Sequence, residues 1–325
     1  MTKNIIVSGV RASGKLHIGN YLGAFKEWLD LQAKDDNQCY FFIADLHGMT
    51  TPFEPKELSE NTLDVAATYL AAGIDPNKST FYLQNHILEH ATLAWIFNCL
   101  LPVAELERMT QYKDKSGAQK ASINAGLLTY PALMAADILM YKATAVPVGE
   151  DQVQHVELTR VVARKFNNRF GKTFPEPKTY LNKPLRIMSL TDPTKKMSKT
   201  GDEALLLDDE PAEIHRKLKK AVTASEPGNQ SAGVDNLFLL LEHFGTKEQI
   251  SQFRDAQRDN SLKFSELKET LAKGVAEHFA EFREKKKELL AKPEYLAEVL
   301  GTGASKARQI AQQTLLEVKE KIGLL

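Results

Sequence analysis

The sequence predicts an α/β fold, with a doubly wound parallel sheet followed by a second, all-helical domain. Apolar runs alternate with amphipathic stretches through the first half of the 325 residues. This is the pattern of a parallel sheet covered by helices on both faces. A proline-rich stretch over 171–200 ends the alternation. In the segments that follow, apolar residues recur with a helical period only, which predicts the all-helical second domain.

The strands and helices of the first half can be placed from their periodicity. Between the apolar runs, the second amphipathic stretch ends at Gly73, a residue type that favours helix C-caps. Nucleotides bind beyond the carboxyl ends of such strands, where the segment from Gly9 to Gly14 falls. We therefore expect a Rossmann-like nucleotide-binding domain over 1–200, with strands at 5–10, 39–44 and 80–84 and helices at 18–34 and 57–72.

The second half begins with a segment that we expect to be a linker and an exposed loop, over 171–200. Pro211 is placed like a first-turn proline, and Thr246 with Gln249 matches a capping box. We expect a helical domain over 201–300 and a C-terminal segment, 301–325, with a helix over 305–325 that can pack back on the first domain. One apolar helix face is predicted for Phe264, Leu267, Leu271, Val275, Phe279 and Phe282.

Composition excludes several classes of protein. The 42 Lys and Arg side chains balance the 42 Asp and Glu side chains, so no overall positive charge attracts nucleic acid. Local basic runs, at 216–220 and 283–287, could touch RNA, although a solvated helix face is the commoner explanation of such runs. Two cysteines form neither a disulfide framework nor a zinc site. No signal peptide or membrane span is recognisable, so we expect a cytoplasmic protein.

The segment from Gly9 to Lys15 reads G-x-x-x-x-G-K, which is a P-loop except for its last letter. A P-loop needs Ser or Thr next, to bind magnesium, and this chain has Leu16. The alternative is a tight turn followed by a helix that begins at His17 or Ile18. His17 and Asn20 then share the first turn, where free N–H groups favour a phosphate.

A second candidate site is the loop that ends in Lys196-Met197-Ser198-Lys199-Thr200. Lysine ammonium groups on a loop can follow charge as it moves from an α-phosphate to a departing pyrophosphate. A solvated basic loop would be the preferred interpretation if this segment stood alone.

These two segments together resemble the HIGH and KMSKS signatures of class I aminoacyl-tRNA synthetases, with Leu16-His17-Ile18-Gly19-Asn20 as the first. Three segments between them resemble the tryptophanyl-tRNA synthetases of bacterial type. They are 106–116, 130–139 and 147–152, and the resemblance extends over essentially the full chain.

The resemblance implies activation of L-tryptophan by ATP, transfer to tRNA(Trp), magnesium carried with ATP, and a homodimer. It implies that the helical domain over 201–300 binds the anticodon. Catalytic lysines would be Lys115, Lys196 and Lys199. ATP would be bound by Arg11, Ala12, Ser13, His17, Gly19, Asn20, Gly149, Glu150, Asp151, Ile187, Lys196, Met197, Ser198, Lys199 and Thr200. Tryptophan would be bound by His47, Tyr130, Met134, Asp137, Val148 and Gln152.

Physical chemistry supports the implied role of Asp137 as the acceptor of the indole N–H. Tyr130, Met134, Asp137 and Tyr141 share one helix face, where an unpartnered carboxylate is costly. The indole N–H can only donate and an ionised carboxylate can only accept. The alternative is an ion pair with a lysine such as Lys142. His47 has an alternative role as a buried polar group with its hydrogen bonds satisfied.

Three other functions compete with this one: a tyrosyl-tRNA synthetase of the same subclass, a P-loop kinase, and a non-catalytic module that binds tRNA or ATP. Met134 beside Asp137 suits a larger apolar ring than a phenol, and Leu16 argues against the kinase interpretation.

For the homodimer, we expect the core of the interface in the apolar stretch 94–103, which includes Trp95, Ile96, Phe97, Leu100 and Leu101.

Overall fold

The computed structural model describes residues 3–12, 15–118, 123–181, 185–198, 201–223 and 231–325. For Ala24 and residues 115–118 it describes the backbone alone. The chain divides into two compact units. The first comprises Met1–Ser13, Glu27–Lys183 and Lys292–Leu325, and the second comprises Gly14–Lys26 and Pro184–Ala291. These limits differ from the expected boundaries at 200 and 300.

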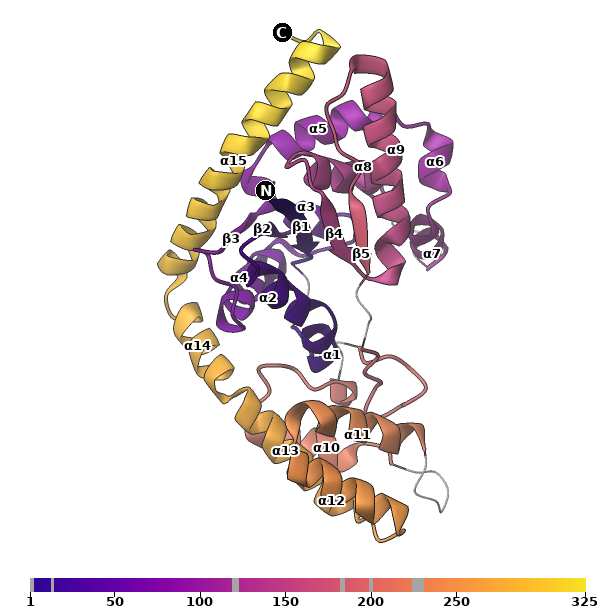
Figure 1. The fold of residues 1–325 in the computed structure, drawn as a ribbon, viewed down its shortest axis with the longest axis vertical. Coiled ribbons are helices and arrows are strands. Elements are labelled where there is room, and N and C mark those ends of the chain that lie inside the picture. The colour runs from indigo at the N-terminus through magenta and orange to yellow at the C-terminus, as the bar shows by residue number, and fades with distance from the viewer. Residues whose placement is uncertain (1–2, 13–14, 119–122, 182–184, 199–200, 224–230) are drawn as a thin grey trace. The chain divides into compact units, whose positions relative to one another are not determined.

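The first unit is built on a five-stranded parallel sheet of order β3-β2-β1-β4-β5 (Figure 1). Its strands are β1 (Asn4–Val10), β2 (Asn37–Ile43), β3 (Ser79–Leu83), β4 (Ala145–Val148) and β5 (Lys178–Leu181). The predicted doubly wound sheet is confirmed, and β1 to β3 lie within a residue or two of the expected ranges. The order reverses direction beside β1, which is where ligands bind in sheets of this kind.

Alternate residues of β2 pack against different layers of helices. Phe41 stacks on Trp28 of α2 (Lys26–Gln32), with ring centroids 4.3 Å apart. Tyr40 and Phe42 belong instead to the core that α5 (Glu89–Asn98), α8 (Ala125–Leu139) and α9 (Val153–Phe170) share. Successive side chains of a strand point to opposite faces, so an uninterrupted apolar run produces a sheet buried on both sides.

The remaining elements of this unit are one predicted helix and several elements that the sequence did not predict. Among them is α4 (Pro55–Ala71), which confirms the predicted helix over 57–72. β5 falls within 171–200, which we had expected to be a linker and a loop, so that expectation is wrong for Lys178–Leu181. The others are α3 (Asp45–Gly48), η2 (Gln84–His86), α6 (Val103–Glu107), α7 (Thr110–Ala118) and η3 (Glu150–Gln152).

The C-terminal helix α15 (Pro293–Ile322) begins twelve residues before the expected start at 305 and packs along β3 (Figure 1). Its contact with the sheet depends on Gly303, where an added Cβ atom would collide with the carbonyl oxygen of Phe81. By contrast, a Cβ atom on Gly301 of the same helix would meet no atom within 4 Å. The absence of a side chain at Gly303 therefore allows the helix to approach the strand backbone.

We expect Gly303→Ala to destabilise the first unit by about 3 kcal/mol, because the added methyl group meets rigid backbone. For a unit of this size, that corresponds to a fall of roughly 6–12 °C in Tm. Gly301→Ala is the matched control and should be neutral or stabilising by up to about 1 kcal/mol. Calorimetry of the three proteins measures both effects, and equal Tm values for the two variants would contradict this explanation.

The second unit is helical apart from its loops. It contains α1 (Ile18–Asn20), the π-helical turn η1 (Tyr21–Phe25), η4 (Gly201–Glu203), α10 (Pro211–Lys220), α11 (Ala232–Phe244), α12 (Lys247–Arg258), α13 (Phe264–His278) and α14 (Ala280–Leu290). Pro211 lies in the first turn of α10, and Thr246 and Gln249 form the predicted capping box. The single predicted apolar helix face is instead divided between α13 and α14, because the helix breaks at Phe279.

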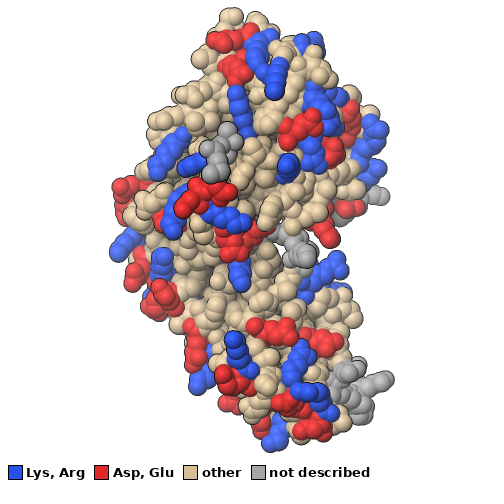
Figure 2. Space-filling model, in the orientation of Figure 1, with Lys and Arg blue, Asp and Glu red and all other residues tan. Residues whose placement is uncertain are grey.

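Acidic and basic side chains are interspersed over the face of the molecule shown in Figure 2. This agrees with the equal numbers of the two kinds in the sequence. Within the described part of the chain, no helix is both long enough and apolar enough to cross a membrane.

Candidate active site

Four polar side chains meet inside the first unit, beyond the carboxyl ends of β2 and β3. His47 lies on α3, directly after β2, and Gln84 opens η2, directly after β3. His90 comes from α5 and Asp137 from the inward face of α8. Because the ends of parallel strands lie along one edge of the sheet, residues distant in sequence converge there.

The Asp137 carboxylate is 1% exposed and accepts hydrogen bonds at both oxygens. Gln84 Nε2 lies 2.8 Å from Oδ1 and 2.9 Å from Oδ2. His90 Nδ1 lies 2.5 Å from Oδ1, and His47 Nε2 lies 2.8 Å from Oδ2. Burial alone would raise the pKa of Asp137, but hydrogen bonds from the two histidines and their electrostatic attraction lower it to about 2. The group is therefore an anion at neutral pH.

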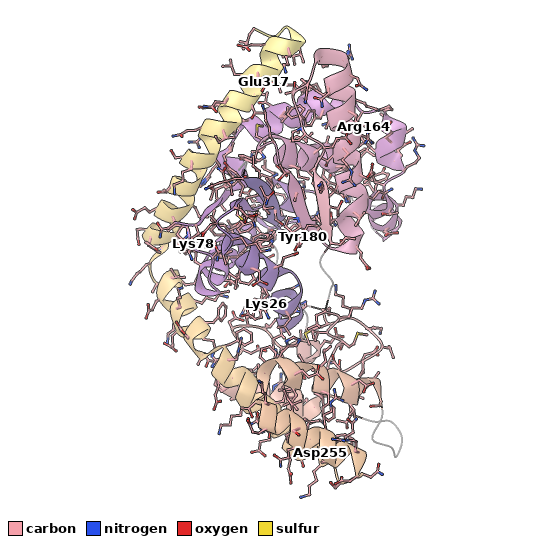
Figure 3. All side chains as sticks on the ribbon, viewed as in Figure 1. Lys26, Lys78, Arg164, Tyr180, Asp255 and Glu317 are labelled. Carbon is pink, nitrogen blue, oxygen red and sulfur yellow. The ribbon has the colours of Figure 1, made fainter. Side chains whose placement is uncertain are left out.

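These contacts bear on the alternatives for Asp137 and His47. The alternative in which Asp137 pairs with Lys142 is wrong, because Lys142 donates to Glu317 of α15 at 2.7 Å; Figure 3 labels Glu317. His47 is buried and bonded to Asp137, as its alternative role requires.

Tyr130 lies about two turns before Asp137 on α8 and takes part in the same polar cluster. Its hydroxyl is 2.8 Å from His155 Nε2, and its ring lies edge-on to His47. Burial raises the pKa of Tyr130 to about 12, although Arg11 opposes the shift, so the phenol keeps its proton. Arg11 donates to the Thr50 hydroxyl at 3.3 Å, and burial lowers its pKa.

The first unit also contains two apolar residues expected to bind tryptophan and the segment that follows β4. Val148, the last residue of β4, is buried, and Met134 is half-buried against the same core. Gly149 precedes η3, and a Cβ atom there would lie 2.9 Å from Asp151 Oδ1. Gln152 donates its amide N–H to Asp151 at 2.7 Å, which leaves the amide oxygen of Gln152 as an acceptor.

The first signature lies in the second unit. His17 is the N-cap residue of α1, and its backbone N–H donates to the side chain of Asn20 at 3.3 Å. The helix start that we predicted is therefore confirmed. The backbone at Leu16 and Ile18 pairs with Leu207 and Leu205, at 3.0 and 2.9 Å, so the turn is held against the segment that follows the lysine loop.

The second signature lies in the same unit and is fixed through its backbone. Met197 is buried, and its N–H donates to the Ile187 carbonyl at 3.0 Å. Asn236 of α11 bonds both backbone groups of Met188, at 2.9 and 3.0 Å. Lys196 is exposed, and Ser198 donates to Glu203 at 2.6 Å. A buried methionine thus anchors a loop whose lysine points to solvent.

Gly19 brings the two signatures together. A Cβ atom on Gly19 would lie 3.5 Å from the Ile187 side chain, and Ile187 carries the hydrogen bond from Met197. The sequence places these segments about 170 residues apart, and the fold of the second unit makes them neighbours.

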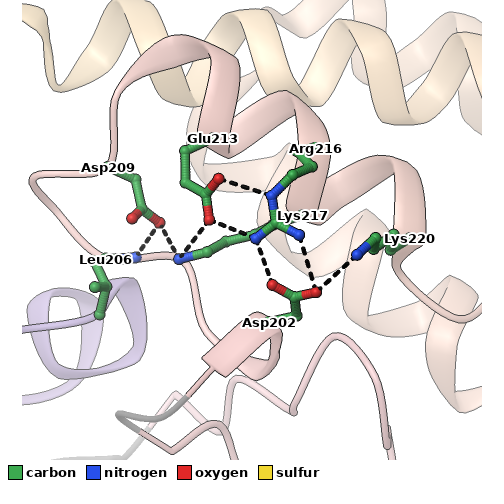
Figure 4. Close-up of polar contacts among 7 residues, drawn as sticks. All are labelled: Asp202, Leu206, Asp209, Glu213, Arg216, Lys217 and Lys220. Carbon is green, nitrogen blue, oxygen red and sulfur yellow. Dashed lines mark hydrogen bonds and ion pairs between the residues drawn. The ribbon is translucent and has the colours of Figure 1, made fainter.

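A network of ion pairs fixes the segment between the lysine loop and α10 (Figure 4). Asp202 bonds Arg216 and Lys220, and Asp209 bonds Lys217 at 2.6 Å. Most cations of the run 216–220 are thus already paired, which favours the simpler interpretation over an RNA-binding patch. In the other run, Lys286 bonds Asp208 at 2.9 Å, and Lys15 of the first turn lies 3.4 Å from the same carboxylate.

Several expected site residues, or their side chains, are not among those that the structure describes. Ser13, Lys199 and Thr200 are outside the described residues, and for Lys115 only the backbone, in α7, is described. Gly9 is described, and it lies opposite Phe42 within β1, as the strand expected over 5–10 requires; the expected tight turn therefore does not begin at Gly9. The Phe42 ring occupies the space that a side chain on Gly9 would need.

The sequence did not lead us to expect four residues that the fold brings to this cluster: Thr50, Gln84, His90 and His155. Gln84 was assigned to the end of a strand, and the polar run that begins with it and follows a buried strand was the available signal. His90 and His155 lie on helices, where a lone histidine carries no such signal.

Comparisons with known proteins agree over the whole chain. The family model of the class I tRNA synthetases (W and Y) matches residues 1–292. The tryptophan–tRNA ligase of Caldanaerobacter subterraneus subsp. tengcongensis is 46% identical over 334 residues, covering 98% of each chain. That of Wolinella succinogenes is 43% identical over 334 residues, covering 100% of each. The crystal structure of tryptophanyl-tRNA synthetase from Campylobacter jejuni complexed with ADP and tryptophan matches with a TM-score of 0.88 and 38% identity, covering 98% of this chain and 99% of that one.

The match to the family model over residues 1–292 places the chain among the class I tRNA synthetases. Similarity of this extent also defines the branch. The chain belongs to the class I tRNA synthetases of the tryptophan and tyrosine group, and within it to the bacterial tryptophan–tRNA ligases.

Proposed function

We propose that this chain activates L-tryptophan with ATP and transfers it to tRNA(Trp), with Asp137 as the acceptor of the indole N–H. The observation that carries the proposal is the pair of nucleotide signatures in a member of the tryptophan–tRNA ligases that matches its relatives over 98–100% of this chain. The relatives named above are not tyrosine enzymes, and Gly9 within β1 does not fit a P-loop kinase. Because tRNA is charged where proteins are made, we expect a cytoplasmic enzyme.

The first step joins the tryptophan carboxylate to the α-phosphorus of ATP, forming tryptophanyl-adenylate and releasing pyrophosphate. The attacking carboxylate is already an anion, so the step needs neither a protein nucleophile nor a general base. Catalysis then consists of positioning and of stabilising the charge on the phosphates. Magnesium enters as part of the MgATP substrate. In the second step, the 3′ end of the tRNA displaces AMP.

For the tryptophan substrate, we propose that the indole ring lies against α8 and that neighbouring polar atoms bind the ammonium group. Met134 and Val148 would form walls for the indole, and His47 would lie beside it. Tyr130 and the amide oxygen of Gln152 would accept from the ammonium group. Gln152 supports this role because its amide nitrogen donates to Asp151 and its amide oxygen can only accept.

On the ATP side, we assign the triphosphate to the two signatures. His17, Gly19 and Asn20 would bind it at the start of the helix, where N–H groups favour anions. Lys196 and Lys199 would neutralise the departing pyrophosphate, with Lys115 as a third cation. The remaining contacts would come from Arg11, Ala12, Ser13, Gly149, Glu150, Asp151, Ile187, Met197, Ser198 and Thr200.

We assign the anticodon end of the tRNA to the helices of the second unit. Most cations of the run 216–220 are paired, so contacts with phosphates would depend on side chains such as Lys219. Lys219 is exposed and lines a groove of about 340 Å³ with His215, Ser265, Lys268 and Glu269. Lys219→Glu should reduce charging of tRNA while tryptophan-dependent ATP–pyrophosphate exchange continues. Equal losses in the two assays, or none, would count against this surface.

We also propose a homodimer, with α5 in the interface. Ile96, Phe97 and Leu101 were expected at its core, but they are buried within the first unit and cannot reach a partner. The helical period leaves a different set exposed. Trp95 is 70% exposed, and Leu88, seven residues earlier on the same face, is also exposed. Exposed large apolar side chains on one helix face are typical of interfaces.

We expect Trp95→Glu to produce a monomer at micromolar protein, because a carboxylate would be buried in an apolar contact. Sedimentation velocity measures the result. Trp95 is a better site for the charge than Leu100, because Leu100 also packs on the core of the unit. The control is Leu316→Glu on α15, which is exposed and apolar and should leave the dimer intact. A monomeric wild type would contradict the dimer, and a dimeric Trp95→Glu would contradict its location.

The whole activity is tested by charging tRNA. Purified protein with ATP and labelled tryptophan should form an acid-precipitable, alkali-labile product on tRNA(Trp). Formation of adenylate without any charged tRNA would contradict the second step.

A further inference from the structure

Two fully buried polar side chains lie behind Asp137. His90 and Gln84 are both 0% exposed, and neither belongs to the residues that the proposed reaction uses. His90 Nδ1 lies 2.5 Å from Asp137 Oδ1, and His90 Nε2 lies 2.8 Å from the Tyr141 hydroxyl. Tyr141, His90 and Asp137 therefore form a continuous hydrogen-bonded chain.

The chemistry of the carboxylate fixes the direction of its hydrogen bond with His90. An ionised carboxylate can only accept, so the proton of His90 is on Nδ1. Tyr141 keeps its proton, since burial raises its pKa. The Tyr141 hydroxyl lies 2.8 Å from Nε2 on the other side of the ring, so His90 is held between its two neighbours. The imidazole lies 5.6 Å from the Tyr141 ring and 6.2 Å from the Phe42 ring, centroid to centroid, so packing holds its plane.

The two oxygens of Asp137 consequently differ. Oδ1 takes its bonds from His90 and Gln84, both enclosed in the core. Oδ2 takes one bond from Gln84 and one from His47, whose ring lies against the pocket residue Tyr130. The two core groups therefore prevent rotation of the carboxylate, and Oδ2 lies on the side of His47 and Tyr130.

We infer that His90, oriented by Tyr141, is a positioning residue that fixes Asp137 as a charged acceptor, and that it thereby sets the preference for a substrate ring bearing an N–H donor. The inference rests on the proposed role of Asp137. Loss of the His90 donor frees the carboxylate to rotate or to take up a proton. A protonated carboxyl group can donate, so it discriminates less between an indole and a ring without N–H.

The test compares two substrates in ATP–pyrophosphate exchange. One is tryptophan and the other is β-(3-benzothienyl)alanine, in which sulfur replaces the ring N–H group. His90→Leu removes the donor and should lower kcat/KM for tryptophan by about 10- to 100-fold, the range for a hydrogen bond to a charged group. The sulfur analogue should lose less than about threefold, and KM for ATP should change less than twofold. His86→Leu, the same change at a half-buried position, is the matched control.

Two conservative variants keep the inference testable if His90→Leu does not fold. His90→Asn retains an N–H near the position of Nδ1 and should recover most of the activity with tryptophan. Tyr141→Phe keeps the ring and removes the hydroxyl that is hydrogen-bonded to Nε2, and it should reduce the preference for tryptophan over the analogue by about three- to tenfold.

The outcomes distinguish a failure of the role of His90 from a failure of the role of Asp137. Equal losses with both substrates in the His90 and Tyr141 variants would show a merely structural role and overturn the inference. If wild type itself uses both substrates equally well, the role of Asp137 fails first. If Asp137→Asn abolishes the preference and the His90 and Tyr141 variants keep it, the inference fails alone.

Discussion

Asp137→Asn is expected to lower kcat/KM for tryptophan by roughly 30- to 1,000-fold, or about 2–4 kcal/mol. The carboxylate accepts from His47, Gln84 and His90. An asparagine offers one oxygen and one NH2 group to the same donors, so at least one buried N–H loses its acceptor. The indole N–H then meets a neutral or wrongly oriented group. Steady-state exchange kinetics with varied tryptophan measure the loss.

The internal control for this variant is ATP, whose KM should change less than about twofold because the triphosphate is assigned elsewhere. Circular dichroism establishes that the variant is folded. Unchanged tryptophan kinetics in a folded protein would remove Asp137 from the indole site, whatever the behaviour of ATP.

Lys196→Ala is expected to slow adenylate formation by about 100- to 1,000-fold while tryptophan binding changes less than about threefold. The lysine would act on charge that develops in the transition state, and removal of one such group costs about 3–4 kcal/mol. Lys196 is exposed beside the buried anchor Met197, so its loss should not disturb the loop. Single-turnover activation and equilibrium binding measure the two quantities separately.

The matched control for Lys196 is its neighbour Lys195. Lys195 already pairs with Asp192 at 2.9 Å, and an exposed pair of this kind contributes little. Lys195→Ala should therefore slow activation less than about threefold. If the two variants lose activity equally, the loop is only a general patch of positive charge.

The parts of this protein that sequence predicts well are those with local causes. Three apolar runs correspond to β1, β2 and β3. A strand that is buried on both faces is a continuous apolar run, so the sequence alone reveals it. The capping box at Thr246 and the first-turn proline at Pro211 are likewise local chemistry. The signatures at His17 and Lys196 were found from motif resemblance, and it is the fold that makes them neighbours.

The parts that sequence could not predict depend on tertiary contacts. β5 is an edge strand with mostly exposed side chains, so it has no apolar run to reveal it. His90 resembles any histidine on an apolar helix until α5 is packed against α8. The basic run 216–220 looked like a possible RNA patch because Asp202 and Asp209, which pair with it, lie before α10 and contact it only in the fold.

ATP–pyrophosphate exchange with each amino acid alone tests the central claim most directly. A purified wild-type enzyme should exchange label rapidly with tryptophan, and with tyrosine or phenylalanine at least about a thousandfold less efficiently, because their rings carry no N–H for Asp137. Comparable or faster exchange with tyrosine would contradict the assignment of this site to tryptophan. An absence of exchange with every amino acid would contradict the activation chemistry itself.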